Sequence, residues 1–197
     1  HGFQAAAGPE VFRVLNKRLG VALECFASPL NSFYGRYCSA FPDVDSPFGS
    51  QGSFWSFQPT SGSFQANPPF VPCIMDAMAD RLESLLVSAE AKSAPLSFAV
   101  FIPGWQECLA WGQLQRSTFL RAHIVVAAVD HGYCDGASHQ RKDSFRVSCY
   151  DTGVFFLQTS AAAKKWVVSE DILEDLRISM AQSVPSTAAE MRQKRSK

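Results

Sequence analysis

The spacing of hydrophobic residues along this chain predicts its helices. Apolar residues that recur every three or four positions share one face of a helix, because an α-helix has about 3.6 residues per turn. This reading gives helices at residues 9–19, 72–86, 109–115 and 170–181, with a further helical piece at 33–41. Proline at the first helical position and Gly20 beyond the last are typical boundaries for the first helix.

Short apolar runs predict the strands, since a strand that is covered on both faces needs no polar alternation. Apolar runs lie at residues 21–27, 96–102 and 123–129, and further strands are predicted at 54–57, 63–66, 144–149 and 154–158. Residues 42–52 form a loop rich in Asp, Ser, Gly and Pro. We expect the last two strands to pair as a closing antiparallel hairpin. The alternation of strands and helices predicts an α/β fold, the second half of a doubly wound sheet with flanking helices.

Three turns follow predicted strands, at residues 28–31, 67–70 and 103–105. In doubly wound sheets, ligands bind outside the carboxyl ends of the strands. We therefore expect the three turns to meet at one edge of the sheet and to form a pocket.

The second turn has the sequence Asn67-Pro68-Pro69-Phe70, which is suited to methylating a planar amide or aryl amine. The nitrogen of such a group is a poor nucleophile because its lone pair is delocalised. The Asn67 side-chain oxygen and the Pro68 carbonyl are two acceptors that hold one amino group out of conjugation. Phe70 offers a face on which a base stacks, and the prolines fix the acceptors before the substrate arrives.

Length and charge limit the classes of function. The chain has 197 residues, 47% of them hydrophobic, which is enough for one domain with a full core. We divide it into a core at residues 1–182 and a basic, disordered tail at 183–197, and we take the chain, which begins with His1, as a fragment of a longer protein. Its 18 acidic and 18 basic residues cancel, so no overall positive field collects nucleic acid. No apolar run approaches the length of a membrane span, and we expect no membrane partner.

The cysteines favour reduced thiols rather than disulfides or a metal site. The six are widely spaced and contain no CxxC pair, which is typical of a cytosolic or nuclear protein. His131, Cys134 and His139 have loosely metal-like spacing, but a zinc site needs a fourth ligand and a tighter pattern. We expect a polar loop there and no metal.

Several longer segments resemble the methyltransferase domain of the phosphorylated-CTD-interacting factor family. They are ECFASPLN (24–31), YCSAFPDVDSPFGS (37–50), SGSFQANPPF (61–70), MDAM (75–78), LSFAVFIPGW (96–105) and VFFLQ (154–158). The resemblance extends to about residue 166. It implies a Rossmann-like, S-adenosylmethionine-dependent methyltransferase that acts on N6 of the 2′-O-methyladenosine next to the cap of mRNA.

The resemblance also assigns roles to individual residues. It implies S-adenosyl-L-methionine as the cofactor and makes Asn67, Pro68, Pro69 and Phe70 the catalytic and cofactor-binding motif. The first turn is a further cofactor-binding segment, through Phe26, Ala27, Ser28, Pro29 and Asn31. Pro103, Gly104 and Trp105 are the substrate-side residues.

The partners follow from the same resemblance. Capped RNA is the implied substrate, and the region that precedes the catalytic core in the family, or a partner subunit, is the implied protein partner. We find no WW module in the sequence, so we do not expect binding to the RNA polymerase II tail. The implied location is the nucleus.

Other residues have two interpretations each. Asp43 or Asp45 either reaches a cofactor hydroxyl or forms a turn. Trp105 either stacks on a base or closes the rim of the core. We expect Trp55, Trp111 and Trp166 to be packing residues, and the tail residues Arg192, Lys194, Arg195 and Lys197 to be either a localisation or RNA-contacting patch or a solvated end.

Two other functions stay open from the sequence. The same Asn-Pro-Pro-aromatic device serves methyltransferases that act on DNA adenine or on protein glutamine. A third reading, from a different class, is a catalytically silent module that binds RNA or a partner subunit.

Overall fold

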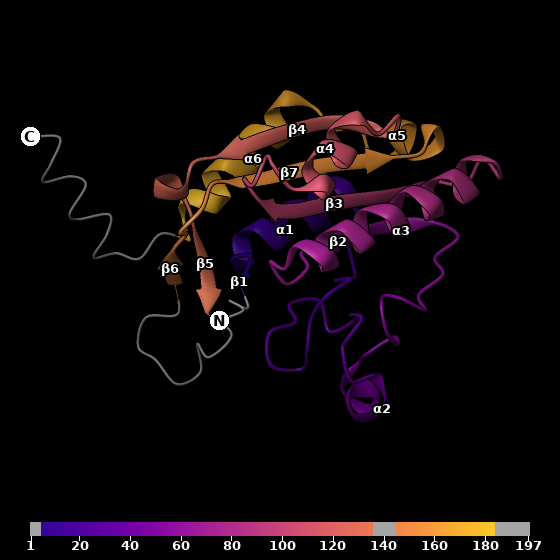
Figure 1. Cartoon of the computed structure of the whole chain (residues 1–197), viewed down its shortest axis with the longest axis horizontal. Coiled ribbons are helices and arrows are strands. Elements are labelled where there is room, and N and C mark those ends of the chain that lie inside the picture. Colours follow the sequence, from indigo (N-terminus) through magenta and orange to yellow (C-terminus); the bar gives the residue numbers. More distant parts are fainter. Residues whose placement is uncertain (1–4, 136–144, 184–197) are drawn as a thin grey trace, which may run out of the picture.

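Strands and helices alternate in the computed structural model, which describes residues 5–135 and 145–183 (Figure 1). The helices are α1 (Pro9–Leu19), α2 (Pro42–Asp45), α3 (Pro72–Glu90), α4 (Leu109–Arg116), α5 (Ser160–Lys165) and α6 (Glu170–Ala181), with short 3-10 turns η1 (Ser46–Phe48) and η2 (Ala128–Asp130). The strands are β1 (Ala5–Ala6), β2 (Gly62–Ala66), β3 (Leu96–Pro103), β4 (Leu120–Val126), β5 (Gly132–Asp135), β6 (Phe145–Val147) and β7 (Thr152–Gln158).

The main sheet has the strand order β2-β3-β7-β4. β2 and β3 are parallel and are joined through α3, as a parallel pair requires a crossover. β7 lies between β3 and β4 and is antiparallel to both. Every residue of β3 and β7 is buried, which explains why their sequences are mostly apolar; the buried polar residues are Ser97, Thr152 and Gln158.

Two hydrophobic cores lie on opposite faces of this sheet. Alternate residues of β3 enter each one: Phe98 and Val100 pack with α3 and α4, whereas Ala99 and Phe101 pack with α1 and α6. The result is a three-layer arrangement of helices, sheet and helices, which is a common solution for a sheet with two apolar faces.

A smaller antiparallel sheet, of order β1-β5-β6, projects from one end of the molecule (Figure 1). It joins the start of the chain to the segment that follows β4. In the described part of the chain, none of the helices is long and apolar enough to cross a bilayer.

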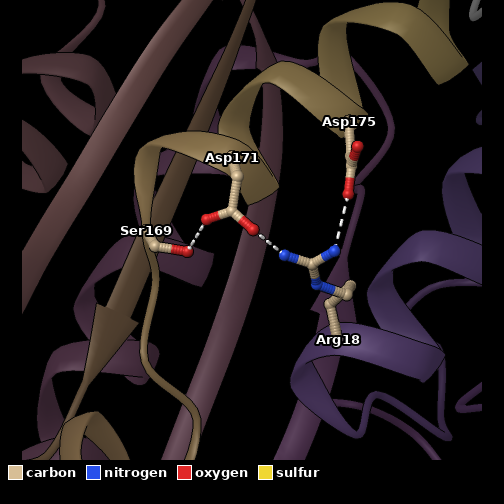
Figure 2. A network of polar contacts seen from close by, with 4 residues as sticks. All are labelled: Arg18, Ser169, Asp171 and Asp175. Atoms are coloured by element: carbon tan, nitrogen blue, oxygen red, sulfur yellow. Dashed lines mark hydrogen bonds and ion pairs between the residues drawn. The ribbon is translucent and has the colours of Figure 1, made fainter.

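Helix α1 is fixed at both ends. Pro9 stands in its first turn, and Gly20 ends it with a left-handed φ of 66°. Figure 2 shows Arg18, near the end of α1, between Asp171 and Asp175 of α6. These ion pairs are partly solvent-exposed, so we expect the apolar contacts between α1 and α6 to contribute more to stability.

The sequence predicted the long elements well. The helices expected at 9–19, 72–86, 109–115 and 170–181 correspond to α1, α3, α4 and α6, and the strands expected at 63–66, 96–102, 123–129 and 154–158 overlap β2, β3, β4 and β7. The α/β class is confirmed.

The shorter predictions failed where local contacts outweigh residue preferences. Residues 33–41 form no helix, because the Cys38 amide bonds to the Glu24 carbonyl and the chain runs extended beside residue 24. Residues 21–27 form only isolated bridges rather than a strand. Residues 54–57 form a turn, in which Arg81 of α3 donates to the carbonyls of Phe54 and Phe57.

The expected closing hairpin is also wrong in its pairing. β6 pairs with β5, and β7 pairs with β3 and β4 instead of β6. The reason is that the centre of β7, residues 154–157, is apolar, so β7 is most stable inside the main sheet, where both of its faces are covered.

We predict that Gly20→Ala destabilises the fold more than Gly35→Ala. Both glycines have a left-handed φ, 66° and 67°, so alanine carries a strain of about 1–2 kcal/mol at either position. A Cβ at residue 20 lies 2.7 Å from Nε1 of Trp166, whereas one at residue 35 meets no atom of the described residues within 4 Å. Urea unfolding of both variants measures the difference, and equal losses would contradict a role for the Trp166 contact.

Candidate functional site

A cavity of about 540 Å³ lies beside the carboxyl end of β2. Most of its wall comes from residues 24–31, 38–45, 53–55 and 65–69, which are far apart in the sequence. Binding sites for small ligands and cofactors typically have volumes of about 300–1,000 Å³. The cavity is therefore large enough for a nucleoside-sized cofactor.

The Asn-Pro-Pro-Phe motif stands between this cavity and a group of aromatic rings. Asn67, Pro68 and Pro69 line the cavity. Phe70 lies outside it, with its ring centre 6.4 Å from that of Trp105 in an edge-on arrangement. The four residues of the motif are thus divided between two sides. The sequence analysis placed Phe70 with the cofactor-binding residues, whereas in the structure Phe70 does not line the cavity.

The backbone around the motif explains this division. β2 ends at Ala66, and α3 begins with Pro72. Between them the Val71 amide donates to the Pro69 carbonyl at 2.7 Å, which closes a tight turn. Two consecutive prolines stiffen that turn, so the side chains of Asn67 and Phe70 have fixed directions.

The first predicted turn forms another part of the cavity wall. Phe26, Ala27, Ser28 and Asn31 line the cavity, whereas Pro29 does not. Asn31 holds the turn in shape, because its side-chain oxygen accepts from the Ser28 amide at 2.7 Å. Four of the five residues predicted for this segment are therefore placed at the cavity.

The next loop contributes an acidic and an aromatic residue. Asp45, in α2, lines the cavity and is buried, whereas Asp43 is exposed and lies outside it. Of the two predicted candidates, only Asp45 is placed to contact a ligand. Trp55 is 45% exposed and lines the cavity, so our expectation of a packing role was incomplete; Trp111 is buried against Phe155, as expected.

Glu24 is a buried carboxylate in the cavity wall that our sequence analysis did not single out. Its side chain is almost fully buried, and Oε1 accepts from the amides of Phe33 and Tyr34 at 2.7 and 3.1 Å. Burial raises the pKa of Glu24 from 4.5 to about 7, although these two hydrogen bonds lower it in part. A polar residue inside an apolar run, Val21-Ala22-Leu23-Glu24-Cys25, was the signal available in the sequence.

Gln65 is a second residue that the sequence analysis missed. It lines the cavity with only 1% of its surface exposed, and its Nε2 has no hydrogen-bond partner among the described residues. It lies two residues before Asn67, which directly follows β2, and the alternation of an extended chain agrees with the position of both residues at the cavity. An amide donor buried without an acceptor is costly, which makes Gln65 a candidate for a ligand contact.

The third predicted turn lies on the far side of Phe70 and does not reach the cavity. Pro103 is the last residue of β3, and Gly104 and Trp105 follow it. Gly104 fits closely against Asp151, whose carbonyl accepts from the Gly104 amide. Trp105 belongs to an aromatic cluster, which we define as Phe70, Trp105, Tyr133 and Tyr150. Trp105 also packs on the core, so the rim-closing interpretation is supported, and base stacking stays a prediction.

In the described part of the loop with metal-like spacing, the ring of His131 has hydrogen-bond partners within the protein. His131 is buried, and its ring nitrogens lie 2.8 Å from the Ala127 carbonyl and 2.7 Å from Oγ1 of Thr152. Tyr133 shares that Thr152 oxygen at 2.6 Å. Residues 5–135 and 145–183 contain no group of three or more acidic, histidine or cysteine side chains able to hold a metal, and His139 lies outside these ranges.

The cysteines are all unpaired, as the sequence suggested, but only two are buried. These are Cys25 and Cys38, which both line the cavity; burial raises the pKa of Cys38 to about 12 and that of Cys25 above its ordinary value. Both thiols are therefore protonated near neutral pH. The predicted basic tail beyond residue 183 lies outside the described residues.

Comparison with known proteins gives consistent matches. The sequence model of a family described as "Phosphorylated CTD interacting factor 1 WW domain" matches residues 1–136. Two proteins, from Mus musculus and Homo sapiens, are each 41% identical to this chain over 186 residues, and both are named mRNA (2′-O-methyladenosine-N(6)-)-methyltransferase. The match covers 92% of this chain and 26% of each relative, so the chain spans about a quarter of their length.

The family description names a WW domain, whereas our sequence analysis found no WW module. The matched segment contains α1 to α4 and strands β1 to β5, so it includes the residues of the cavity wall and the aromatic residues Phe70 and Trp105. The expectation that this chain does not bind the RNA polymerase II tail stays a prediction.

We predict that Glu24→Gln removes part of the pH dependence of stability. The folded pKa of about 7 lies above the unfolded value near 4.5, so Glu24 stabilises the fold when protonated. That contribution is complete below pH 4.5 and is lost as the pH rises through 7; it amounts to about 3 kcal/mol.

Urea unfolding of the wild type and Glu24→Gln at several pH values between 4.5 and 8 tests this prediction. The difference in unfolding free energy should shift in favour of the glutamine variant as the pH rises. A constant difference over this range would contradict a raised pKa for Glu24.

Proposed function

Because the chain belongs to the phosphorylated CTD interacting factor 1 family, we propose that it transfers a methyl group to N6 of the 2′-O-methyladenosine next to the cap of mRNA. The family membership expected from the sequence motifs is thereby confirmed. The observation that carries the proposal is the position of Asn67 and Pro68 in the wall of a nucleoside-sized cavity.

The cavity fits S-adenosylmethionine, which would supply an electrophilic methyl group. Phe26 and Trp55 offer aromatic surface, and Asp45 offers a buried carboxylate for a hydroxyl group. The unpartnered Nε2 of Gln65 and the buried Glu24 are polar groups that a ligand would satisfy. These residues fit a ligand that has an apolar body and several polar groups.

The acceptor adenine would lie on the other side of the motif. The Asn67 side-chain oxygen and the Pro68 carbonyl accept from its amino group and direct the nitrogen lone pair at the cavity. Phe70 provides a stacking face, and Trp105 supports it from the side. As the nitrogen gains positive charge during transfer, the two acceptors bind it more strongly, so they stabilise the transition state selectively.

We take the four-stranded sheet and its helices as part of a Rossmann-like core. Two features support this: β2 and β3 are parallel with α3 as their crossover, and the motif follows the carboxyl end of β2. In single-stranded RNA no duplex has to be opened to place the adenine at this edge.

The partners that we propose are capped RNA and protein from outside this chain. The relatives are about four times as long as the matched segment, so the remainder of such a protein, or a partner subunit, is a source of further cap contacts. We also propose a nuclear location, in keeping with an mRNA substrate.

We predict that Asn67→Ala lowers methyl transfer by about 100-fold or more, because one of two preorganised acceptors is lost. The measurement is nucleoside analysis after incubation with S-adenosylmethionine and a capped RNA that begins with 2′-O-methyladenosine. Asn16→Ala is the matched control, because Asn16 bonds to the Val21 carbonyl outside the cavity.

The same assay distinguishes the alternatives. If a DNA adenine or a glutamine peptide were methylated in preference to capped RNA, the proposed substrate would be wrong. Full activity of Asn67→Ala would exclude the proposed role of Asn67.

We further predict that substitutions of two tryptophans affect different ligands. Trp55→Ala should weaken S-adenosylhomocysteine binding, because Trp55 lines the cavity, whereas Trp105→Ala should raise the KM for capped RNA and leave that binding unchanged. Calorimetry and steady-state kinetics measure the two effects. Loss of cofactor binding in Trp105→Ala would contradict the assignment of Trp105 to the RNA side of the motif.

A further inference from the structure

Glu24 and Gln65 lie side by side in the wall of the cavity. A parallel bridge joins their backbones: the Cys25 amide donates to the Gln65 carbonyl at 2.8 Å, and the Gln65 amide donates to the Leu23 carbonyl at 3.0 Å. Both side chains line the cavity, with 3% and 1% of their surface exposed. Residues paired in this way project to the same face, so the two functional groups are neighbours.

Among the described residues, Glu24 has no cationic partner. The ion pairs of residues 5–135 and 145–183 do not include it, and its hydrogen bonds come from two neutral backbone amides. The titratable side chains around it are Cys25, Tyr34 and, in the same cavity, Cys38 and Asp45, all of them neutral or acidic groups. A cationic ligand group would therefore compensate for the burial of this carboxylate.

Gln65 needs a hydrogen-bond acceptor from a ligand, whereas Glu24 needs a cation. Its Nε2 is a buried hydrogen-bond donor with no acceptor among the described residues. An anionic oxygen is the strongest acceptor for such a donor. A ligand that carries an ammonium and a carboxylate on one carbon atom satisfies both residues at once.

We propose that Glu24 and Gln65 together bind the α-amino acid group of the methyl donor, Glu24 through its ammonium and Gln65 through its carboxylate. This inference rests on the proposed function. The position agrees with the chemistry, because Gln65 of β2 and Asn67, directly after β2, both line the cavity. Two residues of extended chain span about 7 Å, a distance suited to the short linker between the α-carbon and the sulfur.

Binding of this group depends on pH. The pKa of Glu24 is about 7 in the ligand-free chain, and a bound ammonium favours the ionised carboxylate, so binding releases a proton below pH 7. Affinity should fall about tenfold between pH 8 and pH 6. A ligand without the amino acid group should bind without this dependence.

Calorimetry with two ligands tests the proposal on the whole 197-residue chain. S-adenosylhomocysteine contains the amino acid group, and 5′-methylthioadenosine lacks it while keeping the nucleoside and the sulfur. Glu24→Gln and Gln65→Leu should each weaken the first ligand by about tenfold to a hundredfold and the second by less than about twofold. Glu24→Gln should also remove the pH dependence.

Ser63→Ala is the matched control. Ser63 is buried on the same face of β2, its Oγ has no hydrogen-bond partner among the described residues, and it does not line the cavity. Both ligands should bind this variant as they bind the wild type.

The outcomes separate the two levels of inference. The roles of Glu24 and Gln65 would be overturned if the variants weakened the binding of both ligands equally, or of neither. They would also be overturned if wild-type binding did not vary with pH. Either result would leave the cofactor site in place. Failure of the wild type to bind either ligand would overturn the cofactor site of the proposed function, and these roles with it.

Discussion

The hydrogen bonding of β2 on both edges is the constraint on which the rest of the site depends. On one edge β2 is parallel to β3, in register from Gly62 to Ala66. On the other edge it bonds to the backbone around Glu24, which is itself bridged to Tyr37 and, through it, to Ser50. Because the cavity wall is built from these neighbouring segments, fixing β2 also fixes the positions of the residues that face a ligand.

This arrangement gives the Asn-Pro-Pro-Phe motif two sides with different properties. One side is a cavity with buried polar groups at its wall, and the other is an aromatic cluster that extends from Phe70 through Trp105 to Tyr150. A transfer reaction requires a donor and an acceptor to meet at one atom. A stiff turn between two binding surfaces meets this requirement without a large movement of the chain.

The sequence predicted the parts of this arrangement that depend on long patterns. The apolar runs of β3 and β7 and the stripe of α3 were clear, and the motif itself identified Asn67 and Pro68. What failed was local: residues 33–41 and 54–57 are shaped by hydrogen bonds to distant partners, such as those of Arg81 with Phe54 and Phe57, which no pattern within a short window reveals. Pairing failed for the same reason, because β7 enters the sheet between two strands that precede it in the chain.

The candidate site was predictable to a similar degree. The motif was identified from its chemistry and the turn residues from the family resemblance. Glu24, in an apolar run, and Gln65, in an alternating run, were not identified, because a single polar residue in such a run is ordinarily a surface position. Their importance appears only when the fold makes them neighbours and buries both. The division of Phe70 from the other three motif residues was likewise a matter of turn geometry.

A crystal structure of the chain with S-adenosylhomocysteine tests the central claim most directly, because it locates the cofactor relative to Asn67. We predict that the ligand lies in the cavity beside β2, with its sulfur next to Asn67 and its amino acid group next to Glu24 and Gln65. A ligand bound at another place, or one that turns its adenine toward Glu24 and Gln65, would contradict it.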